Sequence, residues 1–237
     1  MKTSHAALEQ PLDFATSAQP NPFDPHAALA AQLLPHAVDK TSGAADGAHD
    51  MVHLLRVWRS VQGLQAAEGG DLQVLLAATL LHDCVNVEKN SPFRAQASAL
   101  AARKAATVLA GLDWPRARTD AVAHAIEAHS YSAAIAPRTV EARILQDADR
   151  LDAIGLIGAA RCFSVGGRLG RALYDPADPR AKQRPLDDTR YTIDHFQTKL
   201  LRLAEGFQTA EGARCAAIRQ QRLRDFYEAL LGEVEDG

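Results

Sequence analysis

The chain has 237 residues, with 26 basic and 29 acidic side chains and a formal net charge of −3. A chain of this length can bury a substantial core, and its charge gives no overall attraction for nucleic acid or for an anionic membrane. We therefore expect no stable nucleic-acid complex and no membrane association, and either a monomer or a homodimer.

The composition favours helices. Hydrophobic residues make up 47% of the chain but aromatic residues only 5%, so the core must be aliphatic and rich in alanine, as in closely packed helices rather than a β-sandwich. The three cysteines (Cys84, Cys162 and Cys215) are far apart and lack metal-binding spacing, which indicates reduced thiols. No signal-peptide pattern or 18-residue apolar run occurs, so we expect a cytoplasmic protein.

In the first half of the chain, hydrophobic spacing predicts three helices after a proline-rich arm. Residues 1–25 are expected to be a flexible arm, followed by a helix to about Val38 and a small-residue linker at 41–47. A helix over about 50–67 has apolar residues at three- and four-residue spacing. Asp71 is expected to cap the next helix, to about Val85, which is apolar nearly all round and should be central.

The second half is predicted to be helical as well. An alanine-rich helix should end at Gly111, and another should run over about 115–129. Residues 139–164 read as one or two helices, bent near Gly155 or Gly158. A long loop is expected at about 166–188, and two amphipathic helices at about 189–205 and 210–232 complete the chain. The prediction is an all-α single domain over residues 26–237.

Two short segments place imidazoles beside apolar helix. His53 and Arg56 lie one turn apart on one helical face, at the margin of the apolar stripe. His82 and Asp83 end the most apolar helix. Either histidine could be a hydrogen-bonded structural residue, and a second His-Asp pair occurs at 49–50, so neither segment is decisive alone.

A third segment concentrates carboxylates. Asp147, Asp149 and Asp152 stand with Arg150 between apolar residues. A buried charged carboxylate without a partner is costly, so a shared metal ion explains the cluster better than a solvated acidic stripe. Two histidines and two aspartates would make a mixed nitrogen and oxygen site. Such a site suits Mn²⁺, which we favour, but also Mg²⁺, Fe²⁺, Co²⁺, Ni²⁺ or Zn²⁺.

The order His … His-Asp … Asp resembles the HD-domain superfamily of metal-dependent phosphohydrolases. The resemblance is closest to its small, single-domain bacterial members similar to nucleotide pyrophosphohydrolases, and it runs from about residue 45 to the C-terminus. The segments that carry it are His49-Asp50-x-x-His53-x-x-Arg56-Val57, His82-Asp83-Cys84-Val85-Asn86, Ala125-Ile126-x-x-His129-Ser130 and Asp147-Ala-Asp149-Arg150-Leu151-Asp152. It implies a helical fold with a central groove in which His53, His82, Asp83 and Asp149 hold one divalent metal.

Other residues fit roles around that metal. Asp83, Glu88 and His129 are the candidates for catalysis, with Glu88 orienting the attacking water. The candidates for substrate binding are Arg56, Lys89, Arg94, His124 and His129. Arg150 and Asp152 are expected to support Asp149. For Lys89 a solvated surface lysine is an equally good reading, and for His124 a histidine-rich helix end.

The chemistry expected from this set is hydrolysis at phosphorus by a metal-activated water. The favoured substrate is a nucleoside triphosphate or similar small nucleotide, cleaved to monophosphate and pyrophosphate. The alternatives are a phosphomonoesterase or cyclic-nucleotide phosphodiesterase on the same site, and a non-catalytic nucleotide-sensing module. The loop at about 166–188 contains five basic residues and could be a lid, an arm to a second subunit or an ordinary surface loop.

Overall fold

The computed structural model describes residues 20–37, 51–85, 87, 96–130 and 133–236. Their helices are α1 (Ala27–Ala37), α2 (Met51–Glu68), α3 (Leu72–Leu81), α4 (Ala97–Gly111), α5 (Arg116–His129), α6 (Val140–Asp152), α7 (Gly155–Arg168), α8 (Asp194–Thr198) and α9 (Ala210–Asp236), with a 3₁₀ turn, η3 (Leu200–Arg202). These ranges contain no sheet, only an isolated β-bridge between Ala172 and Tyr191. The all-α prediction is confirmed. None of these helices combines the length and apolar character needed to cross a bilayer.

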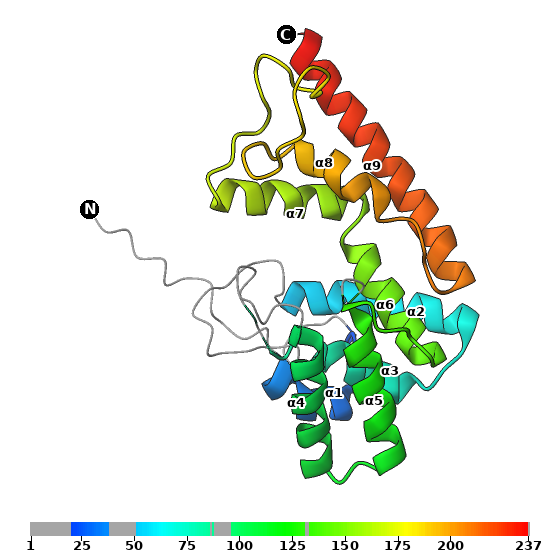
Figure 1. The fold of residues 1–237 in the computed structure, drawn as a ribbon. Helices are drawn as coiled ribbons and strands as arrows, with labels where there is room; N and C mark the ends of the chain where they lie inside the picture. The colour runs from blue at the N-terminus through cyan, green and yellow to red at the C-terminus, as the bar shows by residue number, and fades with distance from the viewer. Residues whose placement is uncertain (1–19, 38–50, 86, 88–95, 131–132, 237) are drawn as a thin grey trace.

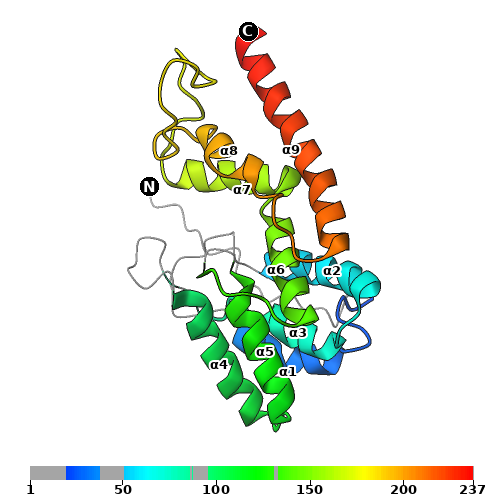
Figure 2. The ribbon, with the colours of Figure 1, turned by 45° about the vertical axis from the view of Figure 1, so that its right-hand side comes forward.

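The helices form two packed parts (Figures 1 and 2). Helices α1 to α6 make the larger part, whose core runs from Leu33 on α1 through α2 and α3 to Leu151 on α6. Helices α7 to α9 enclose a smaller hydrophobic cluster that includes Phe196 and Leu223. The start of α9 packs on α2 and α6, so the two parts meet where α6 ends.

Helix α3 is central in the larger part, as its apolar composition predicts. All eight residues from Val74 to Leu81 are buried. Its first turn is capped by Asp71, whose side chain accepts hydrogen bonds from the backbone N–H groups of Gln73 and Val74 at 2.9 and 3.3 Å. The helix ends at Leu81 rather than near Val85, so His82 is its C-cap residue.

The bend predicted near Gly155 or Gly158 is a complete break between α6 and α7. Gly155 has φ of +71°, a left-handed conformation that favours glycine. An added Cβ on Gly158 would lie 2.3 Å from the carbonyl oxygen of Ala153. Both glycines are therefore needed for α7 to leave α6 at a sharp angle.

The prediction of an amphipathic helix over 189–205 is wrong. Only α8, five residues long, and the turn η3 occur there. Just before α8, the backbone N–H groups of Thr192 and Ile193 donate to the carbonyl oxygens of Ala172 and Leu173 at 2.9 Å each. Long-range main-chain pairing thus replaces the helical hydrogen bonds that the amphipathic pattern suggested.

The predicted N-terminal arm and the predicted linker lie largely or wholly outside the described ranges. Most of the arm at 1–25 and the linker at 41–47 lie outside them. Residues 20–25 are described and pack onto the larger part: Phe23 is buried, and the indole N–H of Trp58 donates to the carbonyl oxygen of Pro22 at 2.9 Å. The non-helical segment predicted at 166–188 starts after Arg168 and extends to α8.

The first turn of α9 is held by Asp147 of α6. The Asp147 carboxylate accepts hydrogen bonds from the backbone N–H groups of Gln208 and Thr209 and from the Thr209 hydroxyl, at 2.7–3.1 Å. Burial raises the pKa of Asp147, although these hydrogen bonds work against that effect. This acid therefore serves the junction between α6 and α9 rather than the histidine cluster.

Close packing at this junction predicts that Gly212→Ala is destabilising. An added Cβ would lie 2.4 Å from Asp147 Oδ2, so the free energy of unfolding should fall by about 1–3 kcal/mol. The control is Gly232→Ala in the same helix, where nothing lies within 4 Å and the free energy should rise by up to about 1 kcal/mol. Urea denaturation of both variants measures the difference. Equal stabilisation by both would contradict the packing.

Candidate metal centre

Four side chains from three parts of the chain converge at one point. His53 comes from the first turn of α2, His82 from the end of α3, Asp83 from the next position, and Asp149 from the last turns of α6. His53 Nε2 lies 3.3 Å from His82 Nε2, 3.7 Å from Asp83 Oδ2 and 3.5 Å from Asp149 Oδ1. His82 Nε2 lies 3.3 Å from Asp83 Oδ2 and 3.9 Å from Asp149 Oδ1.

The second nitrogen of each histidine ring determines where its proton lies. His53 Nδ1 is 2.8 Å from the Asp152 carboxylate, and His82 Nδ1 is 2.8 Å from the carbonyl oxygen of Thr79. Both partners accept only, so both Nδ1 atoms donate, and in the neutral rings the two Nε2 lone pairs face each other. Two facing lone pairs repel each other unless a proton or a metal ion lies between them, and this arrangement is typical of histidine ligands to a metal.

The spacing fits a single metal ion. Donor atoms about 2.1 Å from one ion and 90–110° apart would be separated by about 3.0–3.4 Å, and the separations found here are 3.3–3.9 Å. His53 and His82 are buried, whereas the side chains of Asp83 and Asp149 are 25% and 29% exposed. The cluster is therefore closed on its histidine side and open on its carboxylate side, where water and a substrate can enter.

The electrostatics of the cluster favour a cation. Burial alone would lower the pKa of His82, but the negative charges of Asp83 and Asp149 outweigh it and raise that pKa to about 9. In the absence of a metal, a proton on His82 would supply the positive charge at neutral pH. A metal must displace this proton.

His129 extends the cluster on the other side of His82. Its ring packs edge-on against the His82 ring, with centroids 4.9 Å apart, and its Nε2 lies 4.0 Å from Asp83 Oδ1. His129 Nδ1 donates to the carbonyl oxygen of Ile126 at 2.6 Å, so Nε2 carries the lone pair. Burial, and then the charge of His82, lower the pKa of His129. His129 can therefore contact either the metal or a substrate oxygen.

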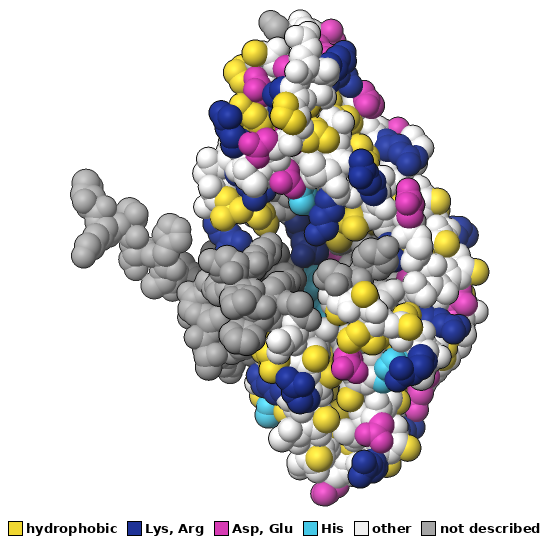
Figure 3. Space-filling model, viewed as in Figure 1, with side chains coloured by type: hydrophobic (Ala, Val, Ile, Leu, Met, Phe, Trp, Pro, Cys, Tyr) yellow, Lys and Arg dark blue, Asp and Glu magenta, His cyan; other side chains and the backbone are white. Residues whose placement is uncertain are grey.

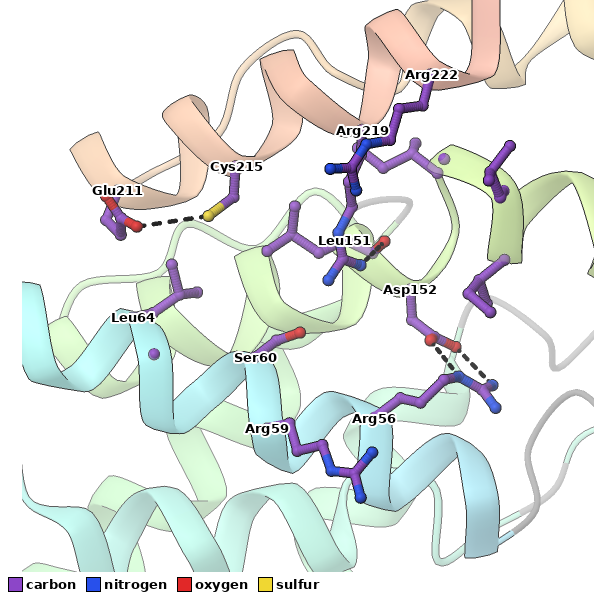
Figure 4. Close-up of a pocket in the computed structure, with 15 residues that line it drawn as sticks. Arg56, Arg59, Ser60, Leu64, Leu151, Asp152, Glu211, Cys215, Arg219 and Arg222 are labelled. Carbon is purple, nitrogen blue, oxygen red and sulfur yellow. Dashed lines mark hydrogen bonds and ion pairs between the residues drawn. The ribbon is translucent and has the colours of Figure 1, made fainter. Parts of the chain in front are cut away.

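Asp152 lies behind His53 and holds it in place. The buried Asp152 carboxylate accepts from His53 Nδ1, from Arg56 at 2.6 and 3.0 Å and from Arg161 at 2.7 Å. Burial alone would raise its pKa, but the hydrogen bonds from His53 and Arg56 hold that pKa well below its usual range. Figure 4 shows the paired contact with Arg56. Asp152 thus fixes the tautomer and orientation of His53.

Comparisons with known proteins identify the family. The HD domain matches residues 51–154, which include all four converging side chains. The uncharacterised protein YpgQ of Bacillus subtilis is 30% identical over 200 residues, which cover 83% of this chain and 87% of YpgQ. The chain belongs to the HD-domain superfamily.

Solved structures of HD proteins agree with this assignment. An HD-superfamily hydrolase from Bacillus thuringiensis superposes with a TM-score of 0.68 at 26% identity, over 90% of this chain and 99% of its own. Bacillus subtilis YpgQ in complex with ADP superposes with a TM-score of 0.64 at 26% identity, over 87% of this chain and 96% of its own. The recognition made from the order of histidines and aspartates is confirmed.

Two other residues predicted for this HD site lie elsewhere. The Arg150 guanidinium, expected to support Asp149, donates to the carbonyl oxygens of Leu203, Glu205 and Gly206 and so holds the segment before α9. His124 Nε2 accepts from the backbone N–H of Arg138 at 3.0 Å, in the segment before α6. Neither contact involves the converging side chains.

Three predicted residues, Glu88, Lys89 and Arg94, lie outside the described ranges, and their roles at the HD site stay predictions.

Arg161 supports Asp152, and the sequence did not predict this role. It stands nine positions after Asp152 in a different helix, and no motif singles it out. Figure 3 shows Lys and Arg side chains gathered at the hollow between the two parts of the molecule.

Proposed function

We propose that this HD protein is a phosphohydrolase that uses one divalent metal, with Mn²⁺ as first choice. The observation that carries the proposal is the convergence of His53 Nε2 and His82 Nε2 beside the partly exposed carboxylates of Asp83 and Asp149. A bound divalent ion would lower the pKa of a water molecule and polarise a phosphoryl oxygen. Mixed nitrogen and oxygen ligands suit Mn²⁺ and its neighbours.

The proposed reaction cleaves a nucleoside triphosphate to monophosphate and pyrophosphate. The water oxygen bonds to the α-phosphorus, the bridging oxygen to the β-phosphorus leaves with pyrophosphate, and one water proton is released. Asp83, at the open side, can accept a proton from water. His129, whose Nε2 carries a lone pair beside Asp83, can accept the same proton as a second base. Glu88, Lys89 and Arg94 are proposed to orient water and bind phosphate.

The proposed substrate class draws on chemistry and on a relative. Phosphate oxygens are hard ligands for the same cations that this site suits. YpgQ, which is similar over most of both chains, has been crystallised with ADP, which supports a nucleotide as the ligand here. Residues 26–237 are proposed to form one HD-type domain, since this length is within the range of a single domain.

A substrate panel with Mn²⁺, Mg²⁺ and Co²⁺ tests the proposal, provided that the assay resolves phosphate from pyrophosphate. We expect pyrophosphate from at least one nucleoside triphosphate, and no product after treatment with EDTA. Free phosphate alone, or turnover only of a cyclic nucleotide, would overturn the pyrophosphohydrolase assignment but keep the metal site. Tight nucleotide binding without any turnover would instead identify a sensor.

His129→Gln is expected to lower kcat without removing the metal. Loss of a positioned proton acceptor costs about 10²–10⁴-fold in rate, while His53, His82, Asp83 and Asp149 are untouched. The matched control is His36→Gln on the exposed face of α1, with less than a twofold effect. Steady-state kinetics and metal content are measured on the same preparations. Loss of metal with the loss of rate would show that His129 is a ligand instead.

A further inference from the structure

A second concave site lies beside the metal centre, between α2, the turn from α6 to α7, and α9 (Figure 4). Its volume is about 460 Å³, which is within the range of small-molecule sites. The four converging residues of the metal centre are not among those that line it. Its lining combines apolar side chains (Leu64, Leu151, Ile154, Leu156 and Ile157) with four arginines (Arg56, Arg59, Arg219 and Arg222).

The acidic side chains of this cavity are already neutralised. Asp152 is bound by Arg56 and by Arg161. Glu211 is bound by Arg214 at 2.6 Å. The cavity therefore has no carboxylate left to balance its other arginines, although the whole chain carries a net charge of −3.

Three arginines supply the excess positive charge. Arg219 and Arg222 extend from α9 into the space between α9 and α2, and Arg59 extends from α2 (Figure 4). Arg219 donates to the carbonyl oxygen of Leu151, a neutral acceptor, and burial lowers its pKa. Within the described residues, no carboxylate lies within 4.0 Å of any of the three guanidinium groups. Arg219 is partly buried, whereas Arg59 and Arg222 are exposed at the cavity. Guanidinium groups without a carboxylate counterion bind phosphate well.

We infer that this cavity binds a small phosphorylated molecule of about nucleotide size. Its phosphate groups contact Arg219 and Arg222, with Arg59 at the rim, and its less polar part lies on Leu151, Leu156 and Ile157. This goes beyond the proposed function, because the ligand binds without the metal and at residues outside the metal centre.

Helix α9 offers a matched pair of substitutions for the test. Arg222 and Arg224 are both exposed, but Arg222 lines the cavity and Arg224, two positions later, does not. ADP is titrated by calorimetry into the full chain after EDTA treatment. We expect Arg222→Gln, and likewise Arg219→Gln, to raise the Kd at least about tenfold, and Arg224→Gln to change it less than twofold. Arg56 is not varied, because it also binds Asp152 behind His53.

Further ligands distinguish the parts of the inference. Inorganic pyrophosphate and adenosine should each bind more weakly than ADP, since each lacks one half of the contacts. Equal losses in Arg222→Gln and Arg224→Gln would overturn the site, as would absence of ADP binding to the EDTA-treated chain. Pyrophosphate binding as tight as ADP would overturn the apolar contact. Because these titrations contain no metal, their outcome is independent of the turnover assays that test the proposed function.

Discussion

Asp149→Ala is expected to abolish metal binding and, with it, hydrolysis. Asp149 Oδ1 lies 3.5 Å from His53 Nε2 and 3.9 Å from His82 Nε2, so its loss removes a carboxylate beside both lone pairs. Substitution of a residue that only supports a metal ligand lowers metal affinity about 10–100-fold. Loss of a ligand itself should therefore lower it more than about 100-fold. Calorimetric titration with Mn²⁺ and metal analysis after dialysis measure the loss.

The same experiment needs a control for folding. Asp120→Ala removes an exposed carboxylate of α5 that contacts only Arg116 among the ion pairs of the described residues, and it should bind Mn²⁺ as the wild type does. Mn²⁺ should raise the melting temperature of the wild type and of Asp120→Ala, because a ligand of the native state stabilises it. A similar rise in folded Asp149→Ala would contradict the assigned site.

Asp152→Asn is expected to damage both stability and metal affinity. The buried amide would keep an acceptor for one donor but would leave Arg56 and Arg161 without their shared carboxylate. Removing one partner of a buried ion pair costs about 3–5 kcal/mol of unfolding free energy. Metal affinity should fall about 10–100-fold, since His53 loses its charged acceptor.

Two measurements separate these effects. Urea denaturation in EDTA gives the stability loss without metal, and Mn²⁺ titration of the folded variant gives the affinity. The control is Asp225→Asn, an exposed residue on α9 whose side chain accepts from Gln221, with expected changes below about 0.5 kcal/mol. Unchanged Mn²⁺ affinity in folded Asp152→Asn would show that Asp152 does not orient His53.

The helices whose starts were predicted correctly begin at residues that typically start a helix. The α5 prediction over about 115–129 matches Arg116–His129 because Pro115 marks its start. The α3 start follows from Asp71. The prediction of a helix over 189–205 is wrong because the apolar spacing there reflects which side chains are buried. The backbone N–H groups that precede α8 donate to Ala172 and Leu173 instead of within a helix. Pairing across some twenty residues leaves no periodic signal in a single sequence.

At the site, too, the sequence predicted what short motifs indicate and missed contacts that depend on how the helices pack. The order of His53, His82, Asp83 and Asp149 predicted that these side chains meet, and the structure brings them together. Their role as ligands stays a prediction. The partners behind them depend on which way each helix is rotated: Asp152 faces His53, whereas Arg150, two positions earlier, binds the segment before α9. Arg161 reaches Asp152 only because α7 turns at Gly155.

Helix α6 carries three carboxylates within the six positions from 147 to 152, and each has a different role. Asp147 holds the start of α9, Asp149 joins the converging histidines, and Asp152 orients His53. One inserted or deleted residue between them would rotate the following side chains by about 100°. Length changes in this segment should therefore be as harmful as substitutions of the acids themselves.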